Sequence, residues 1–414
     1  MSDKVLLQID ACRNCGSTGR INEQIGLLAK QNGWTSYIAH SARYVNQSKL
    51  KSIQIGSKLE EYWHILETKI FDNHGLSSII STQRFINKIQ EINPTIVHLH
   101  TIHGYYVNYK ILFDYLVKSD VPVVWTLHDC WNFTGRCAYF DSIGCDKWKS
   151  MCYDCPIRGG YSISTFRDRS RENYRLKKEC FTSIRNLTLV PVSHWIENLV
   201  NQSFFKELPN VRVHTIQNGI DVNVFKPSFY TTVNLLKKQL NISDKKILLG
   251  CAAPFGVRKG YEDFLTLRQF LDDSYAIIMV GLSQKQKNEV DSKGIIGVTR
   301  TQNVQELVDY YSMADLFVNL TYSDTFPTTN LESLACGTPV LTYDTGGSVE
   351  AVDEYTGIVV EKGDMNVLTE TIKSFTSKPK ISDTCRKRAV LLFDKDVKYQ
   401  EYIDLYESIL KKRK

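Results

Sequence analysis

Two acidic residues, Asp324 and Glu332, are separated by seven residues in the stretch SDTFPTTNLESLACGTPVLTYDTGG. The pattern predicts a loop followed by a short helix that ends at Gly337, a residue type that favours the left-handed conformation after a helix. Polar side chains can cap the start of such a helix, and the candidates here are Thr328, Thr329 and Asn330. The stretch therefore predicts two carboxylates at and just after the start of a helix.

This arrangement suits a polyhydroxyl ligand. Free N–H groups at a helix N-terminus favour an anion or hydroxyl groups. Glu332, expected in the first turn, could accept two hydrogen bonds from a diol such as a ribose, and Asp324 could reach a second polyhydroxyl group. The glycines of the segment 345–347 would let the backbone approach a ligand closely. The alternative is that Glu332 only stabilises its own helix dipole and that the glycines only form turns.

A basic pair, Arg258 and Lys259, lies in the stretch PFGVRKGYEDF. The pair follows a predicted strand, and Gly260 opens the next helix. Two cations at the carboxyl end of a strand suit a diphosphate that is held without a metal ion. The alternative is an ordinary basic pair on the surface.

The elements that must position these residues alternate along the chain. Apolar runs predict strands, and segments with helical spacing follow them. A loop with Gly16 and Gly19 follows the first strand. Near-continuous apolar strands that alternate with helices indicate a parallel sheet covered on both faces. In the first half, strands are expected at 4–10, 35–40, 95–102, 121–129 and 187–193, and helices at 21–33 and 81–93.

The pattern restarts after Pro227, so we expect an α/β protein with two doubly wound, Rossmann-like domains facing a central cleft. The domains would comprise residues 1–227 and 228–395. A closing helix at 396–414, with an apolar stripe, would pack back on the first domain. Ligands of such sheets bind beyond the carboxyl ends of the strands. The second-half strands are expected at 245–254, 275–282, 295–300, 316–321 and 339–344, the helices at 261–271 and 303–314, and the stripe consists of Tyr402, Leu405, Tyr406 and Ile409.

A Cys-rich loop at 130–155 contains five cysteines. The closing Cys152-x2-Cys155 pair has the spacing of a metal site, and Cys137 and Cys145 could complete a structural zinc site with four thiolates. Such a site has no open position for catalysis, and it would hold a long loop over the acceptor side. The alternative is that free thiols pack the loop.

Composition limits the protein class. The chain has 414 residues, of which 43% are hydrophobic and 23% charged, as in a soluble globular protein. The net charge of +6 is too small to indicate nucleic-acid binding. No signal peptide or membrane-spanning run is visible, so a cytoplasmic protein is expected. In a reducing compartment disulfides are disfavoured, and the eleven cysteines favour buried thiols or a metal.

Together these motifs resemble glycosyltransferase family 4, whose members are retaining, metal-independent enzymes of the GT-B fold. The resemblance rests on Asp324-x7-Glu332, the following ACGTPV and GG, the upstream RKG, and IQNGID at the domain junction. The stretches FDNHGLSSIISTQRFINKI, VHLHTIHGYYVNYKIL and TLHDCWNFTGRC in the first half are similar to a subgroup that builds bacterial surface polysaccharides, like the colanic acid enzymes. The match covers nearly the whole chain.

The resemblance implies a role for each matched residue. Arg258 and Lys259 would bind the donor diphosphate and stabilise it as it leaves. Glu332 would hold the ribose, and Asp324 the donor sugar. His128 would face the sugar near the acceptor, with His103 and Asp129 on the acceptor side. Further donor-binding residues would be Gly19, Asn218, Val304, Phe326 and Thr328. No cofactor is expected for catalysis.

Two departures from the family pattern affect these roles. The family usually has Glu at the position of Asp324, and the shorter acid changes the reach toward the sugar. The first loop usually carries paired glycines, whereas here Ser17 and Thr18 precede Gly19. For His103 and His128 the alternative is a hydrogen-bonded histidine without a chemical role, and for His103 this alternative is favoured.

The donor would be a UDP- or GDP-sugar, and the acceptor a glycan or lipid-linked glycan of a capsule, exopolysaccharide or O-antigen. The basic stretch 167–178 suggests peripheral attachment to the inner face of the cytoplasmic membrane. Two other functions are considered: a GT-B sugar-nucleotide 2-epimerase, which needs no acceptor domain facing a membrane, and a non-catalytic protein that binds a nucleotide sugar or a nucleic acid.

Overall fold

The structure is a computed structural model that describes residues 4–157, 159, 161–208, 211–378 and 380–413. The chain divides into two compact units, Met1–Gln217 with Lys398–Lys414 and Asn218–Val397. The division falls at 217/218 rather than at the expected 227/228. The intervening residues belong to the second unit, because Asn218 donates a hydrogen bond to the Phe326 carbonyl and Arg386 donates to the carbonyls of Val222 and Phe225.

The first unit contains a seven-stranded parallel sheet of order β3-β2-β1-β4-β5-β6-β7. In the central strands β1 and β4, consecutive side chains pack in two different apolar clusters, one on each face of the sheet. Leu7 and Val97 pack on one face, and Leu6 and Ile96 pack on the other. The strands are β1 (Val5–Arg13), β2 (Thr35–Val45), β3 (Lys51–Gln54), β4 (Ile96–Leu99), β5 (Val123–Leu127), β6 (Leu187–Pro191) and β7 (Arg212–Val213).

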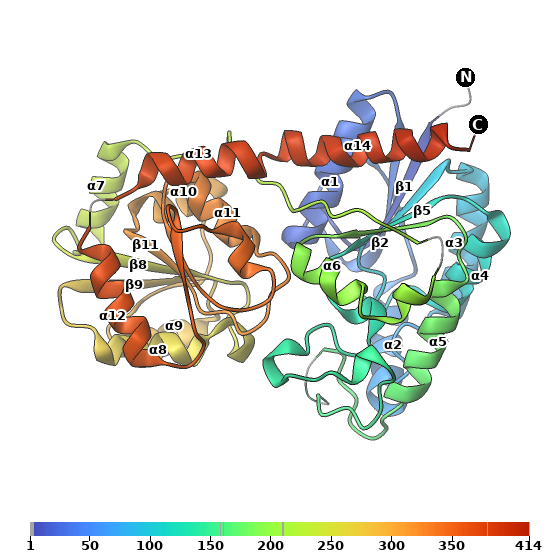
Figure 1. The fold of residues 1–414 in the computed structure, drawn as a ribbon, viewed down its shortest axis with the longest axis horizontal. Helices are drawn as coiled ribbons and strands as arrows, with labels where there is room; N and C mark the ends of the chain where they lie inside the picture. The colour runs from blue at the N-terminus through green and yellow to red at the C-terminus, as the bar shows by residue number, and fades with distance from the viewer. Residues whose placement is uncertain (1–3, 158, 160, 209–210, 379, 414) are drawn as a thin grey trace. The chain divides into compact units, whose positions relative to one another are not determined.

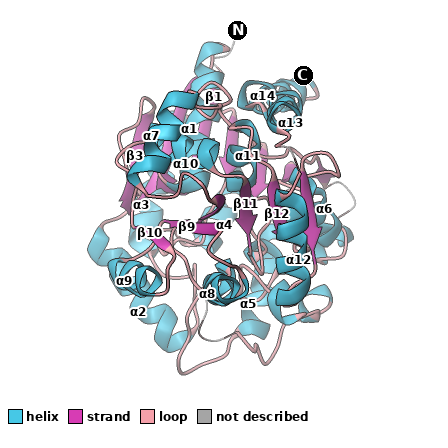
Figure 2. Ribbon diagram, turned by 90° about the vertical axis from the view of Figure 1, so that its left-hand side faces the viewer, coloured by secondary structure: helices cyan, strands magenta, loops and turns pink. Residues whose placement is uncertain are grey.

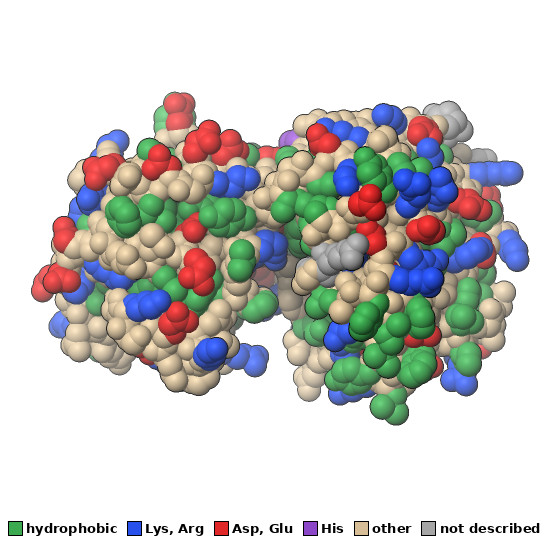
Figure 3. Space-filling view, turned by 90° about the horizontal axis from the view of Figure 1, so that it is seen from below, with side chains coloured by type: hydrophobic (Ala, Val, Ile, Leu, Met, Phe, Trp, Pro, Cys, Tyr) green, Lys and Arg blue, Asp and Glu red, His purple; other side chains and the backbone are tan. Residues whose placement is uncertain are grey.

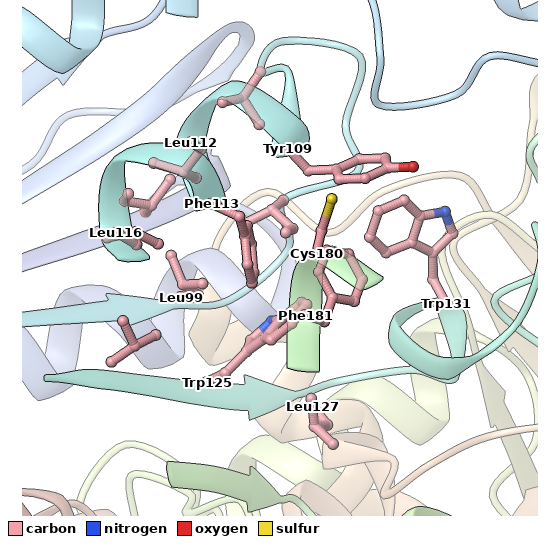
Figure 4. Close-up of a cluster of buried hydrophobic side chains, with 14 of the residues drawn as sticks. Leu99, Tyr109, Leu112, Phe113, Leu116, Trp125, Leu127, Trp131, Cys180 and Phe181 are labelled. Carbon is pink, nitrogen blue, oxygen red and sulfur yellow. The ribbon is translucent and has the colours of Figure 1, made fainter. Parts of the chain in front are cut away.

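Helices cover both faces of this sheet (Figure 1). On one face lie α1 (Gly16–Gln31) and α14 (Lys395–Lys411), and on the other lie α3 (Ile79–Ile92), α4 (Tyr109–Ser119), α5 (Ser170–Thr182) and α6 (His194–Val200). Four aromatic rings cluster on the second face, where the ring of Phe181 lies 4.9 Å from Trp125, 4.6 Å from Phe113 and 6.0 Å from Trp131 between ring centroids (Figure 4). This cluster supports the loop after β5.

Helix α14 returns to the first unit after the chain has built the second. Its side chains Tyr402, Tyr406 and Ile409 are buried against Trp34 and α1. The Tyr406 hydroxyl lies 2.6 Å from His98 Nδ1, and its ring meets Trp34 edge-on at 5.6 Å. The C-terminal helix is therefore part of the core of the first unit.

The second unit contains a six-stranded parallel sheet of order β10-β9-β8-β11-β12-β13. Its strands are β8 (Lys246–Cys251), β9 (Tyr275–Val280), β10 (Ile296–Val298), β11 (Leu316–Asn319), β12 (Val340–Tyr343) and β13 (Gly357–Val360). Figure 2 shows α8 (Tyr261–Phe270), α9 (Gln284–Ser292) and α12 (Met365–Thr376) on one side of these strands, and α7 (Tyr230–Gln239), α10 (Val304–Met313) and α11 (Thr328–Ala335) on the other. The last helix of the unit is α13 (Ser382–Phe393).

The expected pair of doubly wound parallel sheets is confirmed. In each sheet the winding reverses between two neighbouring strands, β1 and β4 in the first unit and β8 and β11 in the second. Loops that leave neighbouring strands at such a point diverge to opposite faces and leave room for a ligand. The predicted basic pair follows β8, and Asp324 follows β11.

Candidate functional site

A charged cluster lies where β8 and β11 of the second unit end. Arg258 and Lys259 belong to a short 3₁₀ helix, Val257–Lys259, and Asp324 lies in the loop after β11. The Lys259 ammonium donates a hydrogen bond to Asp324 Oδ2. The Arg258 guanidinium is 3.9 Å from the same oxygen and donates a 2.7 Å hydrogen bond to the Ser323 carbonyl. The structure therefore brings the predicted cations and the predicted acid together.

The cluster keeps Asp324 ionised. Burial alone would raise the pKa of this carboxyl, but the charges of Lys259 and Arg258 outweigh burial and hold the pKa below its usual value. The Arg258 side chain is 39% exposed and the Lys259 side chain 21%. Two cations that solvent can reach, next to a fixed carboxylate, can bind a doubly charged anion.

The double glycine of the sequence motif supports the Asp324 loop. A Cβ on Gly346, whose φ is +52°, would lie 2.0 Å from the carbonyl oxygen of Asp324. The Gly347 N–H donates a 3.1 Å hydrogen bond to that oxygen. Both glycines thus lie against the protein's own backbone at Asp324, and their close approach to a ligand stays a prediction.

Glu332 is buried and accepts a 2.8 Å hydrogen bond from the Tyr311 hydroxyl of α10. Because α11 begins at Thr328, Glu332 lies in its second turn, and the expectation of the first turn is wrong. Tyr311 was not among the predicted site residues. Its only signal was a tyrosine inside the helix at 303–314, and nothing local showed which way that side chain points.

The expected capping of α11 is also wrong. The N-cap residue is Pro327, and no side chain caps the helix. Proline presets φ near −65° and has no N–H, so the chain can enter the helix directly after it. Asn330 instead accepts a hydrogen bond from Asn319 at 2.8 Å and donates to the Ser348 carbonyl at 3.1 Å, beneath the site.

The other predicted donor residues of the second unit differ in their surroundings. Asn218 donates a 3.0 Å hydrogen bond to the Phe326 carbonyl, and the Phe326 ring is buried against Phe393. These two side chains thus anchor the loop that carries Asp324. Thr328 is half-buried at the start of α11, and Val304 begins α10 with 46% of its surface exposed.

A second polar cluster follows β4 and β5 of the first unit. His103 Nε2 lies 2.9 Å from Asp129 Oδ2, and both side chains are buried. The backbone N–H of Trp131 donates a 2.9 Å hydrogen bond to the other carboxylate oxygen of Asp129. The Tyr161 hydroxyl lies 2.9 Å from His103 Nδ1. Burial alone would raise the pKa of Asp129, but His103 and the hydrogen bonds hold it below its usual value. The carboxylate therefore orients His103.

His128 belongs to a chain of hydrogen-bonded side chains. Its Nε2 lies 3.1 Å from His100 Nδ1, and His100 Nε2 lies 3.2 Å from the Gln8 side-chain oxygen. Since that oxygen can only accept, His100 carries its proton on Nε2, and His128 Nε2–H must donate to His100. Burial lowers the pKa of His128 to about 4, so the imidazole is neutral at pH 7. Its Nδ1 is then the acceptor nitrogen. His100 was missed as a site residue.

Gly19 does not lie in a loop, as was expected, but in the first turn of α1, which begins at Gly16. A Cβ at Gly19 would lie 3.0 Å from the Cys12 Cβ and 3.2 Å from the Asn14 nitrogen. The residue is small because the helix packs directly on the end of β1.

Four cysteines, Cys137, Cys145, Cys152 and Cys155, line one cavity of about 20 Å³ in the Cys-rich loop. Cys137 donates a hydrogen bond to Cys155, which lowers the pKa of Cys155 to about 7. The donor atoms suit zinc. In the described part of the chain, however, no three side chains of His, Cys, Asp or Glu are spaced as a metal site. Zinc stays a prediction.

The predicted basic stretch is only partly a surface feature. Lys177 is buried and donates hydrogen bonds to the carbonyls of Trp131 and Thr134 at 2.8 and 3.1 Å. Lys178 pairs with Glu207. Arg167, Arg171 and Arg175 are exposed. Across the described residues, no helix combines the length and the apolar character that crossing a membrane requires.

Comparison with known families matches both halves of the chain. The family model described as Glycosyltransferase Family 4 matches residues 56–224, and the model described as Glycosyl transferases group 1 matches residues 233–390. Among solved structures, a glycosyltransferase from Rickettsia africae has a TM-score of 0.70 at 14% identity and covers 99% of this chain and 100% of its own. Anabaena HepE in complex with UDP has a TM-score of 0.65 at 13% identity, covering 98% and 100%. These likenesses concern the fold.

Curated relatives match over shorter stretches. The chain is 34% identical over 137 residues to glycosyl transferase WcaC of Escherichia coli (strain K12), whose name places it in colanic acid biosynthesis, covering 31% of this chain and 32% of that protein. It is 27% identical over 203 residues to N,N'-diacetylbacillosaminyl-diphospho-undecaprenol alpha-1,3-N-acetylgalactosaminyltransferase of Campylobacter jejuni, covering 47% and 53%. The chain thus spans about a third to a half of the length of these relatives.

Proposed function

Because this chain belongs to the family 4 and group 1 glycosyltransferases, we propose that it transfers a sugar from a UDP- or GDP-sugar to a lipid-linked acceptor during synthesis of a bacterial surface polysaccharide. We propose further that it does so with retention of configuration and without a catalytic metal. It would work in the cytoplasm, at the inner face of the membrane.

The contact of Lys259 and Arg258 with Asp324 carries this proposal. When a sugar leaves its donor, negative charge develops on the departing diphosphate. Lys259 and Arg258 are fixed before the donor arrives and can stabilise that charge without rearrangement. The incoming diphosphate would share Lys259 with Asp324, which would then turn its oxygens to hydroxyls of the donor sugar.

The remaining donor contacts would come from α10 and α11, and from the residues that anchor the Asp324 loop. Glu332 would accept hydrogen bonds from the ribose hydroxyls, and Tyr311 holds its carboxylate in place. Thr328 would contribute a hydroxyl and a helix N–H, and the backbone at Val304 would line the base. Asn218 and Phe326 would act through the loop that they anchor.

The acceptor side rests on the first unit. A neutral His128 with an accepting Nδ1 can receive a hydrogen bond from a sugar hydroxyl. His103, which Asp129 orients, would bind the acceptor. The name of the Campylobacter relative contains an undecaprenol-linked acceptor, which supports a lipid-linked acceptor here.

The test is a screen of the purified protein against UDP-, GDP- and ADP-sugars in the presence of EDTA, read by thermal shift and by release of the nucleoside diphosphate. We expect one nucleotide to raise the melting temperature and to be released slowly. Glu332→Ala should lose both responses, whereas the exposed control Glu354→Gln should keep them. A 2-epimerase that returns an intact sugar nucleotide would instead convert the donor sugar without net release of the nucleoside diphosphate. No response to any nucleotide sugar would contradict the proposal.

A further inference from the structure

Helix α2 (Lys58–Phe71) carries its side chains in the reverse of the usual order. A helix on the surface of a soluble protein buries its apolar face and exposes its polar face. In α2 the buried side chains are polar, namely Glu61, His64 and Thr68. Apart from Lys58 and Lys69, the exposed side chains of α2 are apolar. Leu59 is 81% exposed, Tyr62 59%, Trp63 62% and Leu66 46%.

Polar contacts fix this orientation. Glu61 accepts a 2.8 Å hydrogen bond from the Arg43 guanidinium, and His64 lies 2.8 Å from the Ser78 hydroxyl through Nδ1. His64 Nε2 accepts a 3.0 Å hydrogen bond from the Gly75 N–H. Rolling the helix to bury its apolar stripe would leave these buried polar groups without hydrogen-bond partners, which is unfavourable. The stripe is therefore held outward.

Neighbouring segments extend the stripe. The Thr165 N–H donates a 2.9 Å hydrogen bond to the Lys69 carbonyl, which places the segment 161–167 beside the end of α2. In that segment Phe166 is 74% exposed and Ile163 42%. We name the whole set the α2 patch, and it comprises Leu59, Tyr62, Trp63, Leu66, Phe71, Ile163 and Phe166. In Figure 3, hydrophobic side chains gather on one side of the first unit, in the right-hand half of the view. A contiguous apolar surface of this kind marks an interaction site.

Chemistry and charge select the partner. Tryptophan, tyrosine and leucine beside lysine or arginine are typical of a helix that lies in the boundary between lipid headgroups and acyl chains. Exposed cations stand at both ends of the stripe, with Lys58 at the start of α2 and Lys69 and Arg167 at its end. The helix has three acids, and none of them is exposed: Glu61 is buried against Arg43, Glu60 accepts a hydrogen bond from the Ser57 hydroxyl at 2.9 Å, and Glu67 is half-buried one turn after Trp63.

We propose that the α2 patch is the surface by which this protein lies on a lipid bilayer. Trp63, Leu66 and Phe166 enter the boundary between headgroups and acyl chains, and Lys58, Lys69 and Arg167 contact the phosphates. The proposal rests on the proposed function in one respect, since a lipid-linked acceptor requires a transferase at the membrane. It differs from attachment through the basic stretch 167–178, because apolar insertion carries the binding.

Flotation with lipid vesicles tests the proposal. The vesicles are made of phosphatidylcholine, with and without phosphatidylglycerol. We expect the full-length protein to float with both, and more with the anionic lipid. The variant Leu59→Ser, Trp63→Ser, Leu66→Ser should lose binding about tenfold or more, because it removes three inserting side chains. The control Phe229→Ser, Tyr230→Ser, Leu235→Ser changes three apolar side chains of the other unit that are more exposed on average, and it should bind as the original protein does.

Trp63 also serves as a probe of depth, because it is the most exposed tryptophan of the described residues. Brominated phosphatidylcholine should quench part of the tryptophan fluorescence, and Trp63→Phe should remove that part. Unchanged flotation of the triple variant would overturn the proposal. The proposal would also be overturned if the original protein bound no vesicles and formed a dimer that the triple substitution converts to a monomer. If the triple variant lost flotation but still bound the nucleotide sugar, the membrane surface would be distinct from the donor site. If the original protein floated but bound no nucleotide sugar, only the proposed function would be contradicted.

Discussion

The Tyr311 hydroxyl donates a 2.8 Å hydrogen bond to Glu332, and both side chains are buried. Tyr311→Phe removes this donor from a carboxylate that we propose to bind the donor ribose. A hydrogen bond to a charged group contributes about 1.5–3 kcal/mol, so we expect the nucleotide affinity to fall about tenfold or more. Isothermal titration with the nucleoside diphosphate measures it. Tyr310→Phe, on the preceding residue of α10, is the control, and equal affinity of both variants would count against a positioning role for Tyr311.

Lys259 is expected to act on turnover more than on binding. Lys259→Met removes the charge closest to the proposed leaving group, and kcat should fall about 10²–10³-fold. It also removes the main charge that holds the pKa of Asp324 down, so the acid limb of the pH–rate profile should move to higher pH. Steady-state kinetics across pH test both effects against the exposed control Lys285→Met. A variant that changed only KM would contradict a role in leaving-group stabilisation.

Acid should destabilise the first unit. Burial lowers the pKa of both His98 and His100 well below the usual value, so the folded unit excludes protons that the unfolded chain binds. Stability is therefore complete above the unfolded pKa of about 6.5 and is lost as pH falls below it, by about 1.4 kcal/mol per pH unit for each histidine. All six tryptophans precede residue 217, so tryptophan fluorescence in urea reports this unit alone. His214→Gln, at an exposed site, should not alter the slope. A pH-independent urea midpoint between about pH 7 and about pH 5 would refute the expectation.

The C-terminal helix should be essential to the first unit. Tyr406 is fully buried between His98 and Trp34. Tyr406→Ala should cost about 3–5 kcal/mol of unfolding free energy, and Tyr406→Phe only about 0.5–1.5 kcal/mol. The urea midpoint by tryptophan fluorescence measures both. If Tyr406→Ala unfolded like the original protein, the packing of α14 described here would be wrong.

Zinc in the Cys-rich loop remains to be tested. We expect about one zinc per chain by elemental analysis, and we expect its loss in the double variant Cys152→Ser, Cys155→Ser. Removing the metal with a chelator should lower the urea midpoint of the first unit and make the four thiols available for alkylation. Cys385→Ser, in the second unit, should retain the metal. A zinc-free protein whose midpoint a chelator leaves unchanged would show that these thiols only pack the loop.

Both parallel sheets could be predicted from the sequence, because buried parallel strands consist of apolar runs, such as the runs that end before Arg258 and Asp324. The sequence also placed these charged residues correctly for the same reason: a loop after a strand keeps its position at the edge of the sheet. The start of α1 was predicted wrongly, because two glycines, Gly16 and Gly19, are typical of a loop. In the structure Gly19 packs on Cys12, and the helix already begins at Gly16.

Side-chain partners across the fold could not be read from local patterns. The Tyr311–Glu332 and His100–His128 contacts join different elements, and the rotation of each helix or loop decides whether they form. Helix α2 was not among the expected helices. Its polar residues face inward to meet Arg43 and Ser78, which is the opposite of the pattern from which surface helices are predicted.

The return of α14 makes the second unit an uninterrupted insertion in the first. On the ribosome, the second unit is complete before the first, whose core lacks Tyr402 and Tyr406 until α14 has been synthesised. A nascent chain that stops after α13 would thus combine a finished second unit with exposed apolar side chains of β1 and β4 in the first. In engineering, residues 218–397 form one cassette that can be exchanged, whereas transplanting the first unit requires both of its separated pieces.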